Sequence, residues 1–237
     1  EPDDMSIFDM LILSPGVSPE LNFIKKAKTA GAEIIGELEI AYRIGSGQYV
    51  AITGTNGKTT TTTLVGEIYK EAGKKTYVVG NIGVAVISKA LAAEEDSWLI
   101  TETSSFQLET IKDFRPEVSA ILNLTPDHID RHKTMENYGR AKAAVFKNQT
   151  PDQYCVVNYD DKECLGLTEN CNAKVVPFSR KTTLDFGVYV DGDTIIIKDE
   201  DGKITEICRP VDLQIPGAHN LENALAACAI AYFGGIE

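Results

Sequence analysis

The residues best suited to chemistry stand in one short stretch, Val50–Thr60, where an apolar strand runs directly into a loop that ends in Lys58-Thr59. Glycines let backbone N–H groups turn toward an anion, lysine adds positive charge, and a threonine hydroxyl can bind Mg²⁺ at a helix N-terminus. The stretch therefore predicts a cradle for the phosphates of ATP or a similar nucleoside triphosphate. The predicted phosphate-binding residues are Gly54, Thr55, Asn56, Gly57, Lys58, Thr59 and Thr60.

The loop is a shortened variant of the common phosphate-binding pattern. Ile52 stands six positions before Lys58, where that pattern has a glycine. A plain glycine-rich turn between a strand and a helix is the alternative interpretation. We favour the nucleotide site because a strand precedes the loop and a helix over Thr60–Ala72 is expected after it.

Polar residues also follow three further predicted strands, in the loops Gly80–Gly83, Glu102–Ser105 and Asn123–His132. Open α/β sheets place their ligand crevice at the carboxyl ends of parallel strands. We therefore expect these loops and the phosphate loop to meet at one edge of a sheet.

Two residues in these loops are candidates to support a metal ion. Glu102 ends an apolar strand, which is where many nucleotide enzymes place a carboxylate toward Mg²⁺. His128 lies in the run Asp127–His132, and a neutral imidazole is a common metal ligand. The alternatives are an exposed acid at the end of a strand and a solvated helix start.

Lys142 lies on the apolar face of a helix expected over Met135–Lys147, because Tyr138 and Val145 are four and three residues away from it. Burial would lower the pKa of this lysine, and a neutral amine can take up carbon dioxide to form an anionic carbamate that binds Mg²⁺. The alternative is a lysine that extends to solvent, and the residues alone favour it.

Two amides stand three residues apart, Asn220 and Asn223, where an alanine-rich helix over Asn220–Phe233 is expected to begin. An amide can satisfy both a donor and an acceptor on an adenine edge. An N-cap role would explain Asn220 but not the pair. Both interpretations stay open on the residues alone.

The composition excludes several classes of protein. The 237 residues are 43% hydrophobic and 24% charged, as in a globular protein with a core, and the net charge of −12 argues against nucleic acid as a partner. The odd number of cysteines without a C-x-x-C pair is typical of reduced thiols. No leader and no apolar run of about 18 residues is present. We expect a monomeric cytoplasmic protein that is not inserted in a membrane.

Strand-length apolar runs alternate with helix-period segments, which predicts a doubly wound α/β fold with a mainly parallel sheet. Ile7–Leu13 and Ile34–Ile35 are expected strands, with a helix from Ser18 to about Ala30 between them. A helix over Leu38–Ile44 is expected next, and Gly45-Ser46-Gly47 is the predicted domain boundary. The strands expected beyond it are Tyr49–Thr53, Thr76–Val79, Trp98–Glu102, Val118–Asn123 and Tyr154–Asn158.

From Lys174 onward, short β-branched runs are separated by Asp-Gly pairs, which are hairpin signals. Ile195–Ile197 and Ile204–Cys208 are expected to pair antiparallel in a small subsheet. The acidic residues around these turns lack the spacing of a calcium loop, so no metal is predicted there.

Taken together, the motifs resemble the ATP-dependent Mur ligases, which build the peptide of bacterial cell-wall precursors. They follow that family's order and span most of the chain: Gly54–Thr60, Gly80–Gly83, Asp127–Asp130, Lys142 and Gly217–Ala224. The segments Ser14–Val17, Gly36–Glu39 and Glu102–Glu109 are most similar to the members that add D-glutamate. The fold implied for the N-terminal residues is the remnant of a Rossmann-like domain.

The resemblance implies that ATP drives addition of D-glutamate to UDP-N-acetylmuramoyl-L-alanine through an acyl phosphate. Lys58, Glu102, His128 and Lys142 would be catalytic, and one or two Mg²⁺ ions would be held by Thr59, Glu102, His128 and a carbamylated Lys142. The nucleotide base would contact Asn220 and Asn223. The implied substrate contacts are Ser14, Pro15, Gly16, Asn81, Ser104 and Gln107.

The implied organisation is residues 1–47 as the latter part of a UDP-substrate domain and 48–237 as a truncated central ATP-binding domain. The family's C-terminal domain would lie outside the chain, so the fragment alone is expected to be inactive. The alternatives are a sibling ligase that adds a diamino acid, a phosphotransferase or NTPase with the same cradle, and a noncatalytic binding module.

Overall fold

The apolar runs after the predicted boundary form the centre of the molecule, a nine-stranded sheet. This computed structural model describes residues 4–236. The strand order is β11-β10-β9-β8-β7-β6-β3-β5-β4. Pairing is parallel from β4 to β9. The parallel part contains β3 (Gln48–Thr53), β4 (Thr76–Gly80), β5 (Trp98–Glu102), β6 (Val118–Ile121), β7 (Tyr154–Asn158) and β8 (Lys174–Ser179).

The antiparallel strands are not a separate subsheet. β9 (Gly187–Asp191) pairs in parallel with β8, and β10 (Thr194–Lys198) and β11 (Ile204–Glu206) then continue the same sheet antiparallel. The predicted pairing of Ile195–Ile197 with the strand after it is confirmed. That strand ends at Glu206 rather than Cys208.

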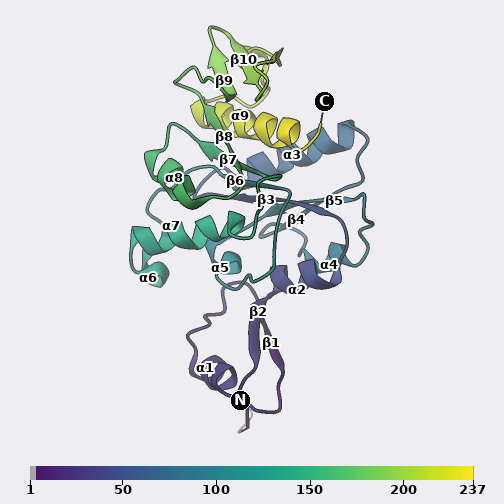
Figure 1. Cartoon of the computed structure of the whole chain (residues 1–237), viewed down its shortest axis with the longest axis vertical. Helices are drawn as coiled ribbons and strands as arrows, with labels where there is room; N and C mark the ends of the chain where they lie inside the picture. The colour runs from purple at the N-terminus through teal and green to yellow at the C-terminus, as the bar shows by residue number, and fades with distance from the viewer. Residues whose placement is uncertain (1–3, 237) are drawn as a thin grey trace.

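Helices cover both faces of the sheet, which confirms the doubly wound α/β class (Figure 1). Residues of α3 (Lys58–Glu71) and α9 (Ala218–Phe233) share one core with Val50 and Ile52 of β3. Tyr49 and Ala51 of the same strand face the second core. This alternation explains why β3 is an unbroken apolar run, since a central parallel strand is buried on both sides.

The second core lies under the remaining helices. Residues of α2, α4, α5, α7 and α8 contribute to it, and α6 packs beside α7. No described helix is both long and apolar enough to cross a membrane. The bounds are α2 (Glu37–Ile44), α4 (Ile87–Ala90), α5 (Ser105–Leu108), α6 (Ile129–His132), α7 (Met135–Ala143) and α8 (Lys162–Leu167).

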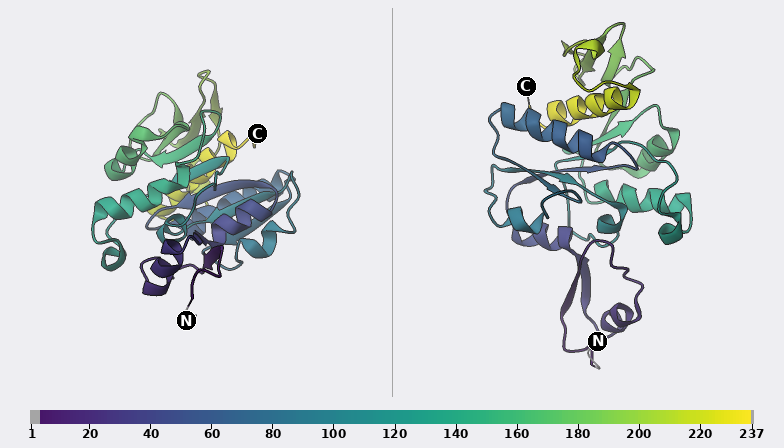
Figure 2. Two further views of the ribbon diagram at one scale, coloured as in Figure 1. Left: turned by 60° about the horizontal axis from the view of Figure 1, so that its bottom comes forward. Right: turned by 180° about the vertical axis from the view of Figure 1, so that it is seen from behind.

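The N-terminal residues form a small unit that projects from the main body (Figures 1 and 2). It contains β1 (Met10–Leu13), α1 (Asn22–Thr29) and β2 (Glu33–Gly36), with the two strands paired in parallel. A parallel β-α-β unit agrees with the Rossmann-like expectation.

Two boundaries in this unit differ from the prediction. The strand begins at Met10 rather than Ile7, and α1 begins at Asn22 rather than after Ser18. Ser18 instead closes a turn, because its carbonyl accepts from the N–H of Leu21 at 3.2 Å and its hydroxyl accepts from that of Glu20 at 3.2 Å. The predicted helix over Met135–Lys147 is α7 followed by a 3₁₀ turn, Ala144–Phe146.

A buried carboxylate joins α2 to the main body. Glu39 has a fully buried side chain and accepts from the backbone N–H groups of Lys112, Asp113 and Phe114 at 2.9, 2.9 and 3.1 Å. Arg43 donates to the same carboxylate at 2.8 Å. Burial raises the pKa of Glu39, but these donors outweigh it and hold the pKa below its usual range.

We expect Glu39→Ala to lower the free energy of unfolding by about 3 kcal/mol, because three N–H groups and a guanidinium lose their acceptor. Chemical denaturation measures this loss. Glu136→Ala is the control, since the side chain of Glu136 is 72% exposed in its ion pair. It should change stability by less than about 0.5 kcal/mol. Equal effects of the two variants would contradict the role assigned to Glu39.

Candidate functional site

The polar loops predicted to share one edge of the sheet are joined there by hydrogen bonds. Thr59 Oγ1, in the phosphate loop, donates to Glu102 Oε2 at 2.9 Å. Asn81 Nδ2, after β4, donates to Glu102 Oε1 at 3.1 Å. Asn123, after β6, accepts from the N–H of Asn56 at 2.8 Å. The prediction that these loops meet at one edge of the sheet is therefore confirmed.

The phosphate loop has the backbone that an anion cradle requires. Gly57 is the N-cap of α3 with φ +81°, so the first N–H groups of a 14-residue helix open into the loop. The positive φ favours glycine here, and a Cβ at Gly57 would lie 2.2 Å from Asn223 Oδ1 unless that side chain moved. This close approach brings Asn223 to the phosphate loop.

Lys58 reaches back into the loop. Its Nζ donates to the carbonyl of Gly54 at 3.0 Å and to that of Thr55 at 2.7 Å. Burial lowers the pKa of Lys58, and Glu102 and Asp127 partly oppose this shift. The ammonium thus lies where the phosphates of a bound nucleotide would enter the cradle.

Thr59 and Glu102 present oxygen atoms that suit Mg²⁺, and Asn81 donates to Glu102 beside them. Glu102 is 2% exposed, and its two oxygens are both held by neighbouring donors. Carboxylate and hydroxyl oxygens are the donors that Mg²⁺ prefers. Residues 4–236 contain no group of three or more His, Cys, Asp and Glu side chains placed to hold a metal, so the candidate set depends on this Thr–Glu pair.

Lys142 points inward from the apolar face on which the helical spacing placed it, and the solvent-exposed interpretation that the residues alone favoured is wrong. The residue is 2% exposed, its Nζ donates to the carbonyl of Gly54 at 2.7 Å, and it lies 4.6 Å from the ring centroid of Tyr138. Burial and the nearby Lys58 lower the pKa of Lys142 to about 7. A substantial fraction of the amine is therefore neutral near physiological pH.

His128 lies on the outer side of the site. Its φ of +51° places it in the left-handed region, which is uncommon for a residue with a side chain. The imidazole is 49% exposed, with Nε2 3.4 Å from the carboxylate of Asp127 and the ring centroid 4.9 Å from that of Phe106. It is thus more open to solvent than Glu102 or Lys142.

The predicted substrate contacts fall in two places. Ser104 and Gln107 lie at the start of α5, where they form a capping box: each side chain accepts from the other residue's backbone N–H. Ser14, Pro15 and Gly16 form an exposed turn after β1, in the N-terminal unit. The capping box shows that Ser104 and Gln107 also have a structural role, which the sequence analysis missed.

A cleft of about 770 Å³ opens beside the phosphate loop. Asn223 lines it, whereas Asn220 donates to the carbonyl of Pro216 and accepts from Asn223 at 3.2 Å. Asn220 is not the N-cap, because α9 begins at Ala218 with Gly217 as its cap. Of the two amides predicted to contact adenine, only Asn223 faces the cleft.

The sequence analysis missed much of the cleft wall. Asn158 ends β7 and Asp160 follows it, so the strand-end rule could have identified them. His219 and Glu222 lie within the motif Gly217–Ala224 but received no role, and no motif marked Lys181 in the segment after β8. The wall residues missed are Asn158, Asp160, Asp161, Lys162, Lys181, His219 and Glu222.

Comparison with known proteins decides the family. A family model described as the Mur ligase middle domain matches residues 52–231. The chain belongs to the Mur ligase family. The resemblance of its motifs is thereby confirmed, and the match covers the whole phosphate site.

Relatives in this family include two proteins named UDP-N-acetylmuramoylalanine--D-glutamate ligase. The one from Alkaliphilus oremlandii is 56% identical over 97% of this chain and 50% of its own length. The one from Clostridioides difficile is 53% identical over 100% of this chain and 52% of its own length. The chain spans about half the length of the curated relatives it matches.

Solved Mur ligase structures share the fold. A UDP-N-acetylmuramate:L-alanyl-gamma-D-glutamyl-meso-diaminopimelate ligase from Neisseria meningitides has a TM-score of 0.67 and 17% identity, with 96% of this chain and 75% of that chain covered. A MurF ligase from Thermotoga maritima in complex with ADP has a TM-score of 0.59 and 16% identity, with 98% and 65% covered.

The pKa of Lys142 makes the stability of this Mur ligase chain depend on pH. Lysine has an ordinary pKa of 10.5, and that of folded Lys142 is about 7. Between these values the unfolded chain binds a proton that the folded chain does not, so the contribution of Lys142 to stability rises with pH. We expect the free energy of unfolding of the wild type to rise relative to that of Lys142→Met between pH 7 and 9.5, by at most about 1.4 kcal/mol per pH unit.

Urea denaturation of both proteins in buffers free of carbon dioxide measures this shift, and other titrating groups cancel in the difference. Lys74→Met, in which an exposed lysine is replaced, is the control and should leave the pH dependence unchanged. A stability difference for Lys142→Met that does not vary with pH would contradict the lowered pKa.

Proposed function

We propose that this chain carries the ATP site of a ligase that adds D-glutamate to UDP-N-acetylmuramoyl-L-alanine in peptidoglycan precursor synthesis. The observation that carries the proposal is the buried Lys142 against the phosphate loop. A simple NTPase needs the cradle, but it does not need an inward lysine with a pKa near 7. The names of the relatives support D-glutamate as the added amino acid.

The reaction requires an activated carboxylate, because a carboxylate is itself a poor electrophile. The terminal carboxylate of the UDP-sugar would attack the γ-phosphorus of ATP, forming an acyl phosphate and releasing ADP. The amine of D-glutamate would then attack the acyl carbon, forming the amide and releasing phosphate and a proton. Lys58 and the N–H groups at the start of α3 would stabilise the negative charge of the transferred group.

Mg²⁺, when bound, neutralises charge on the phosphates and orients them. Thr59 and Glu102 would hold it, together with His128 and a carbamylated Lys142. Carbamylation is supported by the neutral fraction of Lys142 and by its position beside the loop. A carbamate would also replace a buried cation next to Lys58 with an anion.

The nucleotide base would occupy the cleft beside Gly57 and contact Asn223, which Asn220 orients by its hydrogen bond. Asn81, Ser104 and Gln107 would contact the UDP-sugar from the loops after β4 and β5. The predicted contacts Ser14, Pro15 and Gly16 would approach it from the N-terminal unit.

We propose residues 1–47 as part of the UDP-substrate domain and 48–237 as the central ATP domain, with the amino-acid pocket in a C-terminal domain outside this chain. The loop Gly45–Gly47 between α2 and β3 supports this division. Catalysis would then need the full-length polypeptide, which we propose to be a cytoplasmic monomer.

Phosphate release by the full-length protein with ATP, Mg²⁺ and UDP-N-acetylmuramoyl-L-alanine tests the function. We expect release to depend on D-glutamate and not on lysine or diaminopimelate. Release that depends on a diamino acid would keep the mechanism and replace the substrate, whereas release without any acceptor would favour an NTPase. Lys58→Met should lower kcat by at least about 100-fold, as when one transition-state donor is removed.

The carbamate is tested separately. We expect ¹³C-bicarbonate to give a carbamate carbon signal in the wild-type NMR spectrum that is absent in Lys142→Ala and retained in Lys89→Ala. Lys142→Ala should also lower kcat by about 100-fold or more, because a charged ligand is lost from the site. A spectrum identical in the wild type and Lys142→Ala would contradict carbamylation at this residue.

A further inference from the structure

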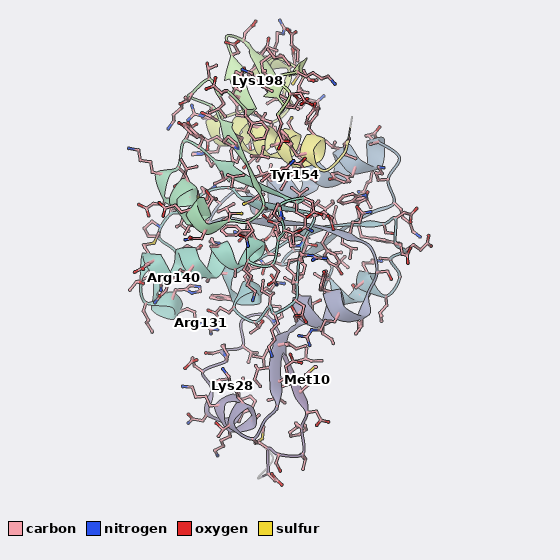
Figure 3. The ribbon with its side chains drawn as sticks, viewed as in Figure 1. Met10, Lys28, Arg131, Arg140, Tyr154 and Lys198 are labelled. Carbon is pink, nitrogen blue, oxygen red and sulfur yellow. The ribbon has the colours of Figure 1, made fainter. Side chains whose placement is uncertain are left out.

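Six side chains from two short helices and their cap residues form one packed group next to the site, which we call the α5–α6 cluster. Figure 3 labels one member, Arg131, on the side of the main body that faces the N-terminal unit. Apart from His128, none of them has a role in the proposed reaction. The members are Ser105, Phe106, Glu109, His128, Arg131 and His132.

Phe106 is the centre of this cluster. Its ring centroid lies 4.9 Å from that of His128 and 5.6 Å from that of His132, and it is nearly parallel to the His132 ring at 17°. The guanidinium of Arg131 lies 5.2 Å from the same centroid. Stacking and cation–π contacts of this kind each contribute about 0.5–1.5 kcal/mol and restrict the orientation of both partners.

Polar contacts also hold the members of the cluster together. Ser105 Oγ and His132 Nε2 are 2.9 Å apart, and Glu109 Oε1 lies 3.5 Å from His132 Nδ1. Arg131 donates to Glu109 Oε2 at 2.6 Å. These contacts join the first and fifth residues of the Ser105–Glu109 segment to α6.

The order Ser–His–Glu is also that of a hydrolase triad, but burial argues against a nucleophilic role. Ser105 is 2% exposed and His132 6% exposed, so a substrate has no direct route to the hydroxyl. The same contacts connect α5 to α6.

The α6 segment needs this connection to α5 because its own backbone hydrogen bonds do not make so short a helix stable. It is a four-residue helix, and the residues on either side of it, His128 and Lys133, both have positive φ, +51° and +72°. A helix this short has little stability of its own. Residues in the left-handed region persist only where surrounding contacts hold them. For His128, the surrounding contact is the one with the ring of Phe106.

We propose that Phe106 and His132 are positioning residues that hold the imidazole of His128 toward the metal–nucleotide complex. The inference rests on the proposed function, because it takes His128 as a metal ligand. Phe106 acts through direct ring contact, and His132 acts by fixing α6 to α5 through Ser105. The cluster also connects the loop after β5 to the loop after β6.

The test measures Mn²⁺ binding to the full-length protein with the nonhydrolysable analogue β,γ-imido-ATP, by electron paramagnetic resonance. We expect Phe106→Leu and Ser105→Ala to raise the Mn²⁺ dissociation constant about 10-fold, as when a partner that orients a metal ligand is removed. Analogue affinity without metal should not change. Phe106→Tyr keeps the ring and should restore Mn²⁺ affinity to within about 2-fold of the wild type.

Phe186→Leu is the matched control, because this aromatic residue packs against Phe233 on the far side of the sheet. It should not change Mn²⁺ affinity. Thermal denaturation of every variant verifies folding, and Ser105→Ala, which removes one oxygen, decides the question if Phe106→Leu does not fold.

His128→Gln separates this inference from the proposed function. Unchanged Mn²⁺ affinity in His128→Gln would remove His128 from the metal site and overturn this inference, whereas the proposed ligase function would still be decided by D-glutamate-dependent phosphate release. Weaker binding in His128→Gln with normal binding in Phe106→Leu and Ser105→Ala would leave the proposed metal site intact and overturn the positioning role.

Discussion

The alignment of parallel strand ends around β3 is the constraint on which the rest of the structure depends. Ile52 of β3 lies opposite Glu102 of β5, and Thr53 lies opposite Ile121 of β6, so three loops leave the sheet at the same level. Burial on both faces sets this register, because a shift by one residue would turn every side chain of β3 to the wrong core. Thr59 and Glu102 meet as a consequence, although they are 43 positions apart.

The site contains buried charged groups, and burying any one of them without a nearby partner would be unfavourable. Two lysines share the carbonyl of Gly54, and one of them is almost completely buried. Burial and the neighbouring cation both disfavour the charged form of Lys142, and its pKa is lowered as a result. A phosphate-binding enzyme can use this arrangement, because an anionic ligand or a carbamate offsets the excess positive charge.

Short helices at the site are held by side-chain contacts in addition to their few backbone hydrogen bonds. The α5 helix begins with the Ser104–Gln107 capping box, and α6 is tied to it through Ser105 and His132. On the other side of the second core, the buried carboxylate of Glu39 anchors α2 to the loop 112–114. Such local ties allow loops with few regular hydrogen bonds to keep a defined geometry.

The sequence by itself determined the α/β class, the motif of the phosphate loop and the edge at which the polar loops meet, because these follow from hydrophobic period and from residues adjacent along the chain. Only the tertiary structure decided that Lys142 points inward, that β9–β11 extend the main sheet, that Asn220 supports Asn223, that Lys181 lines the cleft, and that Phe106 packs against His128. These features depend on contacts between segments distant in sequence, and such contacts leave no local pattern for periodicity or motifs to detect.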